Sequence, residues 1–317
     1  MRNKNPFRSI IFRQIRNLSI LLLPVLFVLQ SCQSKTADNS YRFVFMTDIH
    51  VQPERKAAEG FKQAIAKVNE LNPEFVITGG DLIMDALGQS FERSTQLYDL
   101  YNSLIKDFKM PVYNTIGNHE VFGLYKKSGI NPDHPEYGKE MYRKRLGDNK
   151  TYFSFDHKGW HFMLLDAVGF TPERRYTADI DSLQMLWIEE DLKSVSKETP
   201  IIISTHIPFI SAAAQIYNGG NKANGKRIAV GNSNKVLSLF ENHNLRIVLQ
   251  GHLHIVEEYI YKDIHFITGG AVSARWWRGD IEGFPEGFAV IDIQNKKDFT
   301  WHYQTYGWKA VKEEKND

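Results

Sequence analysis

Short apolar stretches alternate with longer amphipathic stretches along most of this chain. Residues 41–46 and 75–78 are rich in aromatic and β-branched side chains, which is typical of buried strands. Between them, residues 56–71 repeat apolar positions at helical spacing and predict an amphipathic helix. A second helix over 91–108 and a strand over 112–116 continue the order. This pattern predicts a β-α-β series and therefore an α/β fold with parallel strands.

The second half of the chain predicts more strands and fewer helices. A helix is expected over 181–195, with Leu183, Leu186, Trp187 and Leu192 packing inward, and a short helix over 234–241. Residues 121–150 interrupt the rhythm with several Gly and Pro residues, and they form either a lid or a solvated surface loop. Strands are expected at 151–155, 160–165, 201–204, 246–250, 257–261, 264–268, 288–293 and 299–303.

The beginning of the chain has a different pattern. Residues 1–17 contain five basic side chains and no acidic one, and an apolar run over 18–29 follows. This run is short for a bilayer span and contains Pro24, so it predicts a signal peptide over 1–31. The alternative is an uncleaved anchor.

Cys32, the only cysteine, directly follows this leader, and the junction resembles a bacterial lipobox. The resemblance implies lipidation of Cys32 and a lipid-anchored protein of the bacterial cell envelope, periplasmic or surface-facing. Residues 32–40 would then be a tether, 41–306 the folded domain and 307–317 a charged tail.

The formal net charge changes sign once the leader is removed. The whole chain has a formal charge of +2, but residues 32–317 hold 34 basic and 37 acidic side chains, a formal charge of −3. The mature protein therefore has no basic bias toward a nucleic-acid duplex. Because its one cysteine would be lipidated, no disulfide is available and stability must come from a packed core.

Polar residues that can bind metal ions gather where the predicted strands end. Imidazole and carboxylate groups suit transition metals, and strand ends hold them in fixed positions. One Asp could instead cap a helix and one Asn could close a turn, but the whole set favours a site. Its members are Asp48, His50, Asp81, Asn118, His119, His206, His252 and His254.

As a set, these motifs resemble the calcineurin-like metallophosphoesterase family. They occur in the family's order: Asp48-x-His50, Gly79-Gly80-Asp81, Gly117-Asn118-His119-Glu120, His206 after a strand, and Gly251-His252-x-His254. Glu120 stands where the family more often has Asp. The resemblance implies a four-layer α/β/β/α sandwich that hydrolyses phosphomonoesters or phosphodiesters, with the choice between them open. The alternative is a non-catalytic binding protein on the same scaffold.

The resemblance also implies a role for each motif residue. Two metal ions (Fe, Mn, Zn or similar) would be shared by Asp81 and would activate a bridging water as hydroxide. His119 would protonate the leaving oxygen or stabilise phosphoryl charge, with Glu120 orienting it. The first ion would be bound by Asp48, His50, Asp81 and His254, and the second by Asp81, Asn118, His206 and His252.

A final candidate is the segment Arg275-Trp276-Trp277-Arg278, which follows a predicted strand and two glycines. Trp276 or Trp277 could stack on a substrate and Arg275 could bind its phosphate. The alternative is that the tryptophans pack against the protein and the arginines extend into solvent.

Overall fold

The computed structural model describes residues 39–311. The predicted signal peptide, the lipidation site Cys32, most of the predicted tether and the end of the charged tail lie outside these residues. Within residues 39–311, no helix has the length and apolar character needed to cross a membrane.

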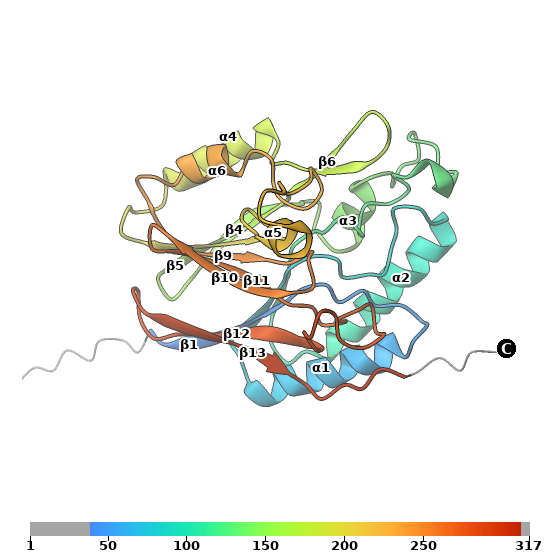
Figure 1. Ribbon diagram of the computed structural model, residues 1–317, viewed down its shortest axis with the longest axis horizontal. Coiled ribbons are helices and arrows are strands. Elements are labelled where there is room, and N and C mark those ends of the chain that lie inside the picture. Colours follow the sequence, from blue (N-terminus) through green and yellow to red (C-terminus); the bar gives the residue numbers. More distant parts are fainter. Residues whose placement is uncertain (1–38, 312–317) are drawn as a thin grey trace, which may run out of the picture. The chain divides into compact units, whose positions relative to one another are not determined.

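Two sheets make up the centre of the domain (Figure 1). The five-stranded sheet has the order β13 (Phe299–Thr305), β12 (Gly287–Ile293), β1 (Tyr41–Met46), β2 (Phe75–Thr78) and β3 (Val112–Asn114). The six-stranded sheet has the order β10 (Val256–Tyr261), β11 (Ile264–Gly269), β9 (Asn244–Gln250), β8 (Pro200–Thr205), β5 (Trp160–Leu165) and β4 (Phe153–His157).

Parallel pairing brings the site-bearing strand ends together. Strands β1, β2 and β3 pair in parallel in one sheet, and β5, β8, β9 and β11 do so in the other. The carboxyl ends of parallel strands lie at one edge of a sheet, which is where such folds bind ligands.

Helices cover the outer faces of both sheets (Figure 1). Helices α1 and α2 pack on the five-stranded sheet, and α4 and α6 pack on the six-stranded sheet. This is the expected four-layer α/β/β/α arrangement. The helices are α1 (Ala57–Leu71), α2 (Phe91–Leu104), α3 (Glu140–Arg145), α4 (Ser182–Leu192), α5 (Ala213–Asn218) and α6 (Ser233–Ser238), with short 3-10 turns η1 (Ile105–Asp107) and η2 (Lys126–Ser128).

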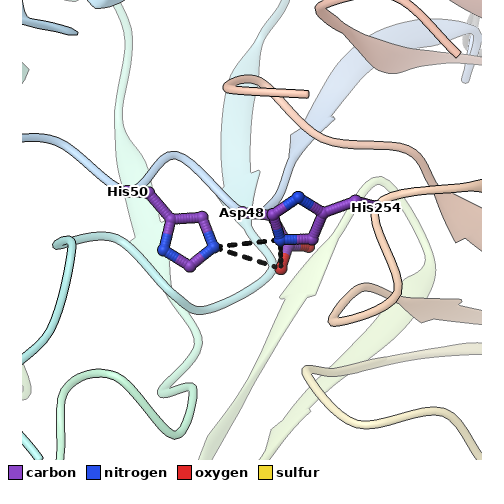
Figure 2. Close-up of side chains that lie close together, drawn as sticks. All are labelled: Asp48, His50 and His254. Carbon is purple, nitrogen blue, oxygen red and sulfur yellow. Dashed lines mark hydrogen bonds and ion pairs between the residues drawn. The ribbon is translucent and has the colours of Figure 1, made fainter. Parts of the chain in front are cut away.

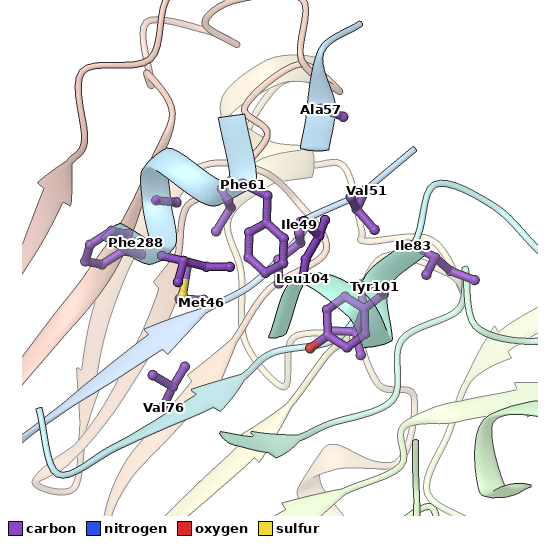
Figure 3. Packing of buried hydrophobic residues seen from close by; sticks show 14 of the residues in the cluster. Met46, Ile49, Val51, Ala57, Phe61, Val76, Ile83, Tyr101, Leu104 and Phe288 are labelled. Carbon is purple, nitrogen blue, oxygen red and sulfur yellow. The ribbon is translucent and has the colours of Figure 1, made fainter. Parts of the chain in front are cut away.

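Three apolar clusters account for the continuous apolar runs of the strands. On β1, Phe43 and Phe45 point between the sheets, whereas Val44 and Met46 point toward the helices. Figure 3 shows the helix side of this packing, where Phe61 of α1 lies over the sheet. Strands buried on both faces need apolar residues at every position, which is why they do not alternate with polar ones.

The predicted packing of α4 is wrong in part. Leu183 and Leu186 are 70% and 61% exposed, whereas Gln184 and Ile188 are buried. Gln184 turns inward because its side-chain amide donates to the Asp166 carbonyl at 2.7 Å and accepts from the Asp166 N–H at 2.9 Å. These two bonds satisfy buried backbone groups that would otherwise lack partners.

The region after β5 contains a hairpin that the sequence pattern did not predict. Strands β6 (Val168–Phe170) and β7 (Tyr176–Ala178) pair in antiparallel orientation and form a separate small sheet. Helices α3 and α5 were also missed, because each spans only six residues and too few turns to show a clear period.

Candidate metal centre

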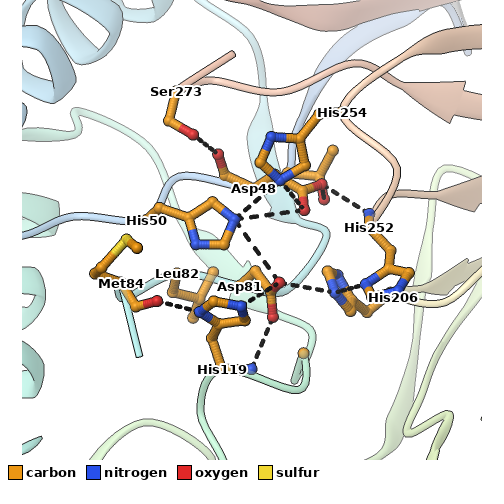
Figure 4. Close-up of polar contacts among 12 residues, drawn as sticks. Asp48, His50, Asp81, Leu82, Met84, His119, His206, His252, His254 and Ser273 are labelled. Atoms are coloured by element: carbon orange, nitrogen blue, oxygen red, sulfur yellow. Dashed lines mark hydrogen bonds and ion pairs between the residues drawn. The ribbon is translucent and has the colours of Figure 1, made fainter. Parts of the chain in front are cut away.

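The structure brings the eight strand-end residues of the sequence prediction into one site. They come from the loops after β1, β2, β3, β8 and β9, and Figure 4 shows the side chains of all but Asn118 pointing toward one another. Seven of the eight fall into overlapping groups whose ligand atoms lie within 4.8 Å of one another. These groups are Asp48–His50–His254, His50–Asp81–His119 and Asp81–His206–His252.

The first group places two imidazoles against one carboxylate (Figure 2). His50 Nε2 and His254 Nε2 lie 3.0 Å apart. Asp48 Oδ1 lies 3.2 Å from His254 Nε2 and 3.8 Å from His50 Nε2. Three ligand atoms that converge at such distances can surround a single ion.

Asp81 joins this group to the group of His206 and His252. Its Oδ2 lies 3.2 Å from His206 Nε2 and 3.7 Å from His50 Nε2. His252 Nδ1 lies 3.2 Å from His206 Nε2. One carboxylate oxygen therefore faces imidazoles of both groups, and the Asp81 backbone reaches this position next to Gly80, whose φ is +87°.

Backbone carbonyls orient three of the imidazoles. His254 Nδ1 bonds to the Ala274 carbonyl at 2.5 Å, and His206 Nδ1 bonds to the Gly79 carbonyl at 2.8 Å. His252 uses its other nitrogen, Nε2, which bonds to the Arg227 carbonyl at 2.8 Å. Because a carbonyl only accepts, the neutral rings carry their proton on the outer nitrogen, and the inner nitrogen presents a lone pair.

Two buried oxygens complete a donor set that suits a divalent ion. Asp48 Oδ1 and Asn118 Oδ1 have no hydrogen-bond partner in the described part of the chain. The other oxygen of Asp48 is occupied, since Oδ2 accepts from Thr47 Oγ1 at 2.7 Å and from the His252 N–H at 2.9 Å. Buried oxygens are rarely left unpaired, and metal ions bound at the two groups would satisfy both of these.

The electrostatics also favour a cation. Burial lowers the pKa of His50 to about 4, and burial together with His206 lowers the pKa of His252 to about 4, so both rings are neutral at pH 7. Burial alone would lower the pKa of His206 too, but the Asp81 carboxylate outweighs it and raises the value to about 9. The same negative field attracts a divalent ion, which competes with the proton.

Five of the candidate ligands have a left-handed backbone. Asp48, His50, Asp81, His252 and His254 all have φ between +47° and +72°. Side-chain-bearing residues rarely adopt this left-handed region, and the cost is of order 1–3 kcal/mol each. Five strained residues in one cluster indicate that the fold maintains this geometry for a function rather than for stability.

His119 lies at the open side of the cluster. Its Nε2 is 3.7 Å from Asp81 Oδ2, its Nδ1 contacts the Met84 carbonyl, and its side chain is 20% exposed. It is thus more accessible than the imidazoles around it, of which His50 and His206 are fully buried.

The prediction that Glu120 contacts and orients His119 is wrong. The carboxylate does not reach the His119 ring. Its two oxygens accept from four backbone N–H groups, those of Asp81, Leu82, Ile83 and Gly117, at 2.7–3.2 Å. The extra methylene relative to Asp places the carboxylate under the Asp81 loop, so Glu120 positions a candidate ligand.

The tryptophan pair divides between two environments. Trp277 is 1% exposed and its indole N–H donates to the His50 carbonyl at 3.0 Å, so the predicted substrate contact does not fit this residue. Trp276 is half-buried, with its ring centroid 4.8 Å from that of His254. Arg275 is exposed beside it. Positive φ angles at both tryptophans turn consecutive rings to different sides.

Some supporting residues were missed at the sequence level. Ser273 Oγ donates to the Asp48 carbonyl at 2.8 Å, and Thr47 holds the Asp48 carboxylate (Figure 4). Thr47 directly precedes the first motif, which is the one signal that could have found it. Arg227 contacts His252 through its backbone carbonyl, a contact with no signature in the sequence.

Known proteins support this reading of the site. A family model for calcineurin-like phosphoesterases matches residues 41–256. No curated protein sequence gives a significant match. A dimetal phosphatase from Danio rerio has a TM-score of 0.59 at 15% identity, covering 84% of this chain and 96% of that one, and it shares the fold.

Two other solved structures are more distant. A putative 5′-nucleotidase from Staphylococcus aureus has a TM-score of 0.48 at 15% identity, covering 83% of this chain and 53% of that one. GAP50 of Plasmodium, the anchor in the inner membrane complex, has a TM-score of 0.47 at 13% identity, with coverages of 84% and 85%. The family match spans most of the chain, which therefore belongs to the calcineurin-like phosphoesterases and is a metal-dependent phosphoric ester hydrolase.

Proposed function

We propose that this protein is a dinuclear phosphoesterase that hydrolyses phosphomonoesters or phosphodiesters outside the cytoplasm. One observation carries the dinuclear assignment: Asp81 Oδ2 faces His50 of one group and His206 of the other, at 3.7 and 3.2 Å. A shared carboxylate holds two cations close while its negative charge offsets their repulsion.

The ligands divide as the two groups do. Asp81 belongs to both sets; Asp48, His50 and His254 complete the first, and Asn118, His206 and His252 complete the second. When bound, two divalent ions supply a water nucleophile at neutral pH and positive charge for the phosphoryl transition state.

His119 is proposed as the proton donor to the leaving oxygen. Its Nδ1 is held by the Met84 carbonyl, which leaves Nε2 directed at the site. A proton on Nε2 can then pass to an ester oxygen bound beside Asp81. Glu120 keeps the Asp81 loop in place and does not take part in this transfer.

The site of action is proposed from the leader alone. A basic start, a short apolar run and Cys32 favour export and lipid anchoring in a bacterial envelope. Such an enzyme would act on small phosphoesters in that compartment.

The test is metal content and hydrolysis in one preparation. The purified mature protein, loaded with Mn²⁺, should contain two ions per chain and hydrolyse p-nitrophenyl phosphate, bis-p-nitrophenyl phosphate or both. Asp81→Ala should lose metal and activity together. A protein that binds two ions yet hydrolyses no ester would instead be the non-catalytic binding protein, and a protein with one ion would refute the dinuclear assignment.

A further inference from the structure

Arg227 borders the metal centre on the side of His252. The carbonyl of Arg227 accepts from His252 Nε2 at 2.8 Å. The Arg227 guanidinium lies over the ring of Tyr176, 5.6 Å from its centroid. The same ring approaches the His252 imidazole edge-on, with centroids 6.1 Å apart. A single tyrosine ring therefore separates the guanidinium from a proposed metal ligand.

The backbone that carries Arg227 is fixed to β7. The Ala178 N–H donates to the Lys226 carbonyl at 2.8 Å, and the Gly231 N–H donates to the Ala178 carbonyl at 3.0 Å. Together with the bond to His252, these hydrogen bonds hold this short segment in place. The Arg227 side chain is exposed, so the fold fixes its origin and leaves its charged end open to solvent.

Arg175 extends the same wall. Its guanidinium lies 5.0 Å from the centroid of the Tyr125 ring. Arg175 and Tyr176 are adjacent in the chain, which joins the contact of Arg175 with Tyr125 to the contact of Arg227 with Tyr176. The two arginines and two tyrosines thus form one patch, which we call the Arg175–Arg227 wall.

Both guanidinium groups of this wall belong to exposed residues. Arg174, their neighbour, differs: it donates hydrogen bonds to the carbonyls of Gly123, Leu124 and Ile130 and ties the β6–β7 hairpin to the body of the protein. Arg174 is structural, whereas Arg175 and Arg227 are exposed to solvent.

We propose that the Arg175–Arg227 wall binds a second anionic group of the substrate while the ester phosphoryl group binds at the metal centre. The proposal rests on the proposed function and narrows its substrate class to phosphoesters with a further carboxylate or phosphate. Guanidinium groups bind both anions through paired N–H donors. Tyr125 and Tyr176 support the guanidinium groups by cation–π contact and are positioning residues.

Binding of non-hydrolysable phosphonates tests the wall without depending on turnover. Calorimetry on the Mn²⁺-loaded mature protein would compare propylphosphonate with 4-phosphonobutyrate and with propane-1,3-bisphosphonate. The last two add a carboxylate and a second phosphonate to the same three-carbon chain and separate the two anion types. Either should bind about 10- to 100-fold more tightly than propylphosphonate, the gain typical of hydrogen bonds to charged groups.

Variants test whether the tighter binding of the charged phosphonates comes from the Arg175–Arg227 wall. Arg227→Gln and Arg175→Gln should reduce the preference for the charged phosphonates about tenfold or more and leave propylphosphonate binding unchanged. Lys297→Gln is the matched control, because it removes one charge at the β12–β13 turn, at the opposite end of the strands. All three positions are exposed, so melting temperatures should stay within about two degrees of wild type, the shift of a sub-kcal/mol surface change.

The outcomes distinguish a failure of the Arg175–Arg227 wall from a failure of the proposed phosphoesterase function. Equal binding of all three phosphonates by wild type, or a preference that survives both arginine variants, would overturn the wall and leave the phosphoesterase intact. Failure to bind Mn²⁺ or any phosphonate would overturn the proposed function and this inference together.

Discussion

Glu120 Oε2 accepts a hydrogen bond from the Asp81 N–H at 3.0 Å, and its partner oxygen accepts from Leu82 at 2.7 Å. The buried carboxylate thus holds the turn that presents Asp81 to both imidazole groups. The carboxylate of Glu120 thus acts on the backbone of the Asp81 loop and not on the imidazole of its sequence neighbour His119.

Glu120→Gln should destabilise the fold and weaken metal binding. The amide group replaces one acceptor oxygen and faces backbone N–H donors, which leaves buried donors unpaired at about 1–3 kcal/mol each. We expect a loss of about 2 kcal/mol or more in urea unfolding, with reduced Mn²⁺ affinity. Glu70→Gln, which removes the negative charge of a surface ion pair with Lys67, is the control. Unchanged stability and metal affinity with a slower turnover would indicate instead that Glu120 takes part in proton transfer.

Much of the fold and site could be predicted because the signals are local. The β1 run and the motif Asp48-x-His50 are adjacent in the chain, and a strand fixes where its next residues go. The same holds for β2 with Asp81 and for β9 with His252. Parallel pairing then brings distant motifs to one edge, as the α/β order predicts.

The features that the sequence did not predict depend on contacts between distant segments. Trp276 and Trp277 are identical in type and adjacent, yet their backbone angles send one to the site and one into the core. Gln184 is inward because of the Asp166 backbone, 18 residues away in sequence. Arg227 contacts the site through its backbone carbonyl, which bonds to His252 Nε2. None of these relationships has a periodic or compositional signal.

Metal binding and proton transfer should separate in two variants. Asp81→Ala removes the oxygen between the two imidazole groups, so metal content and activity should fall together. His119→Ala should keep its metal, because His119 lies outside both proposed ligand sets, while turnover falls about 10²–10⁴-fold. Metal analysis beside steady-state kinetics checks both. A metal loss in His119→Ala as large as that in Asp81→Ala would contradict the division.

Cys32→Ser should release the protein from the membrane. The sequence places a basic leader and a short apolar run directly before this cysteine, and lipidation needs its thiol. Fractionation of cells that express wild type and the variant checks the result, with activity as an internal marker. Firm membrane association of a fully processed Cys32→Ser protein would show that another element anchors it.

His161 should make stability depend on pH. Burial lowers the pKa of His161, but hydrogen bonds with Asp191 and Asp156, both at 2.8 Å, outweigh it and raise the net value above 6.5. A raised pKa contributes stability that is complete below pH 6.5 and is lost as pH rises through the folded-state pKa. His161→Gln should therefore cost about 1.5–3 kcal/mol at low pH and less at alkaline pH. Exposed His302→Gln is the control, and a cost independent of pH would contradict the ion pair.

The two tryptophans should respond to substitution in opposite ways. Trp277→Ala removes a buried ring that packs on Trp308 and bonds to the His50 carbonyl, so unfolding free energy should fall by about 3–5 kcal/mol. Trp276→Ala should leave stability nearly unchanged, because the ring is half-buried beside His254. It should raise KM for aryl or nucleotide esters by the equivalent of about 1–3 kcal/mol, as for other stacking contacts, and hardly alter hydrolysis of a small alkyl phosphate. Equal KM changes for both substrate types in Trp276→Ala would show that this ring shapes the metal site and does not contact the leaving group.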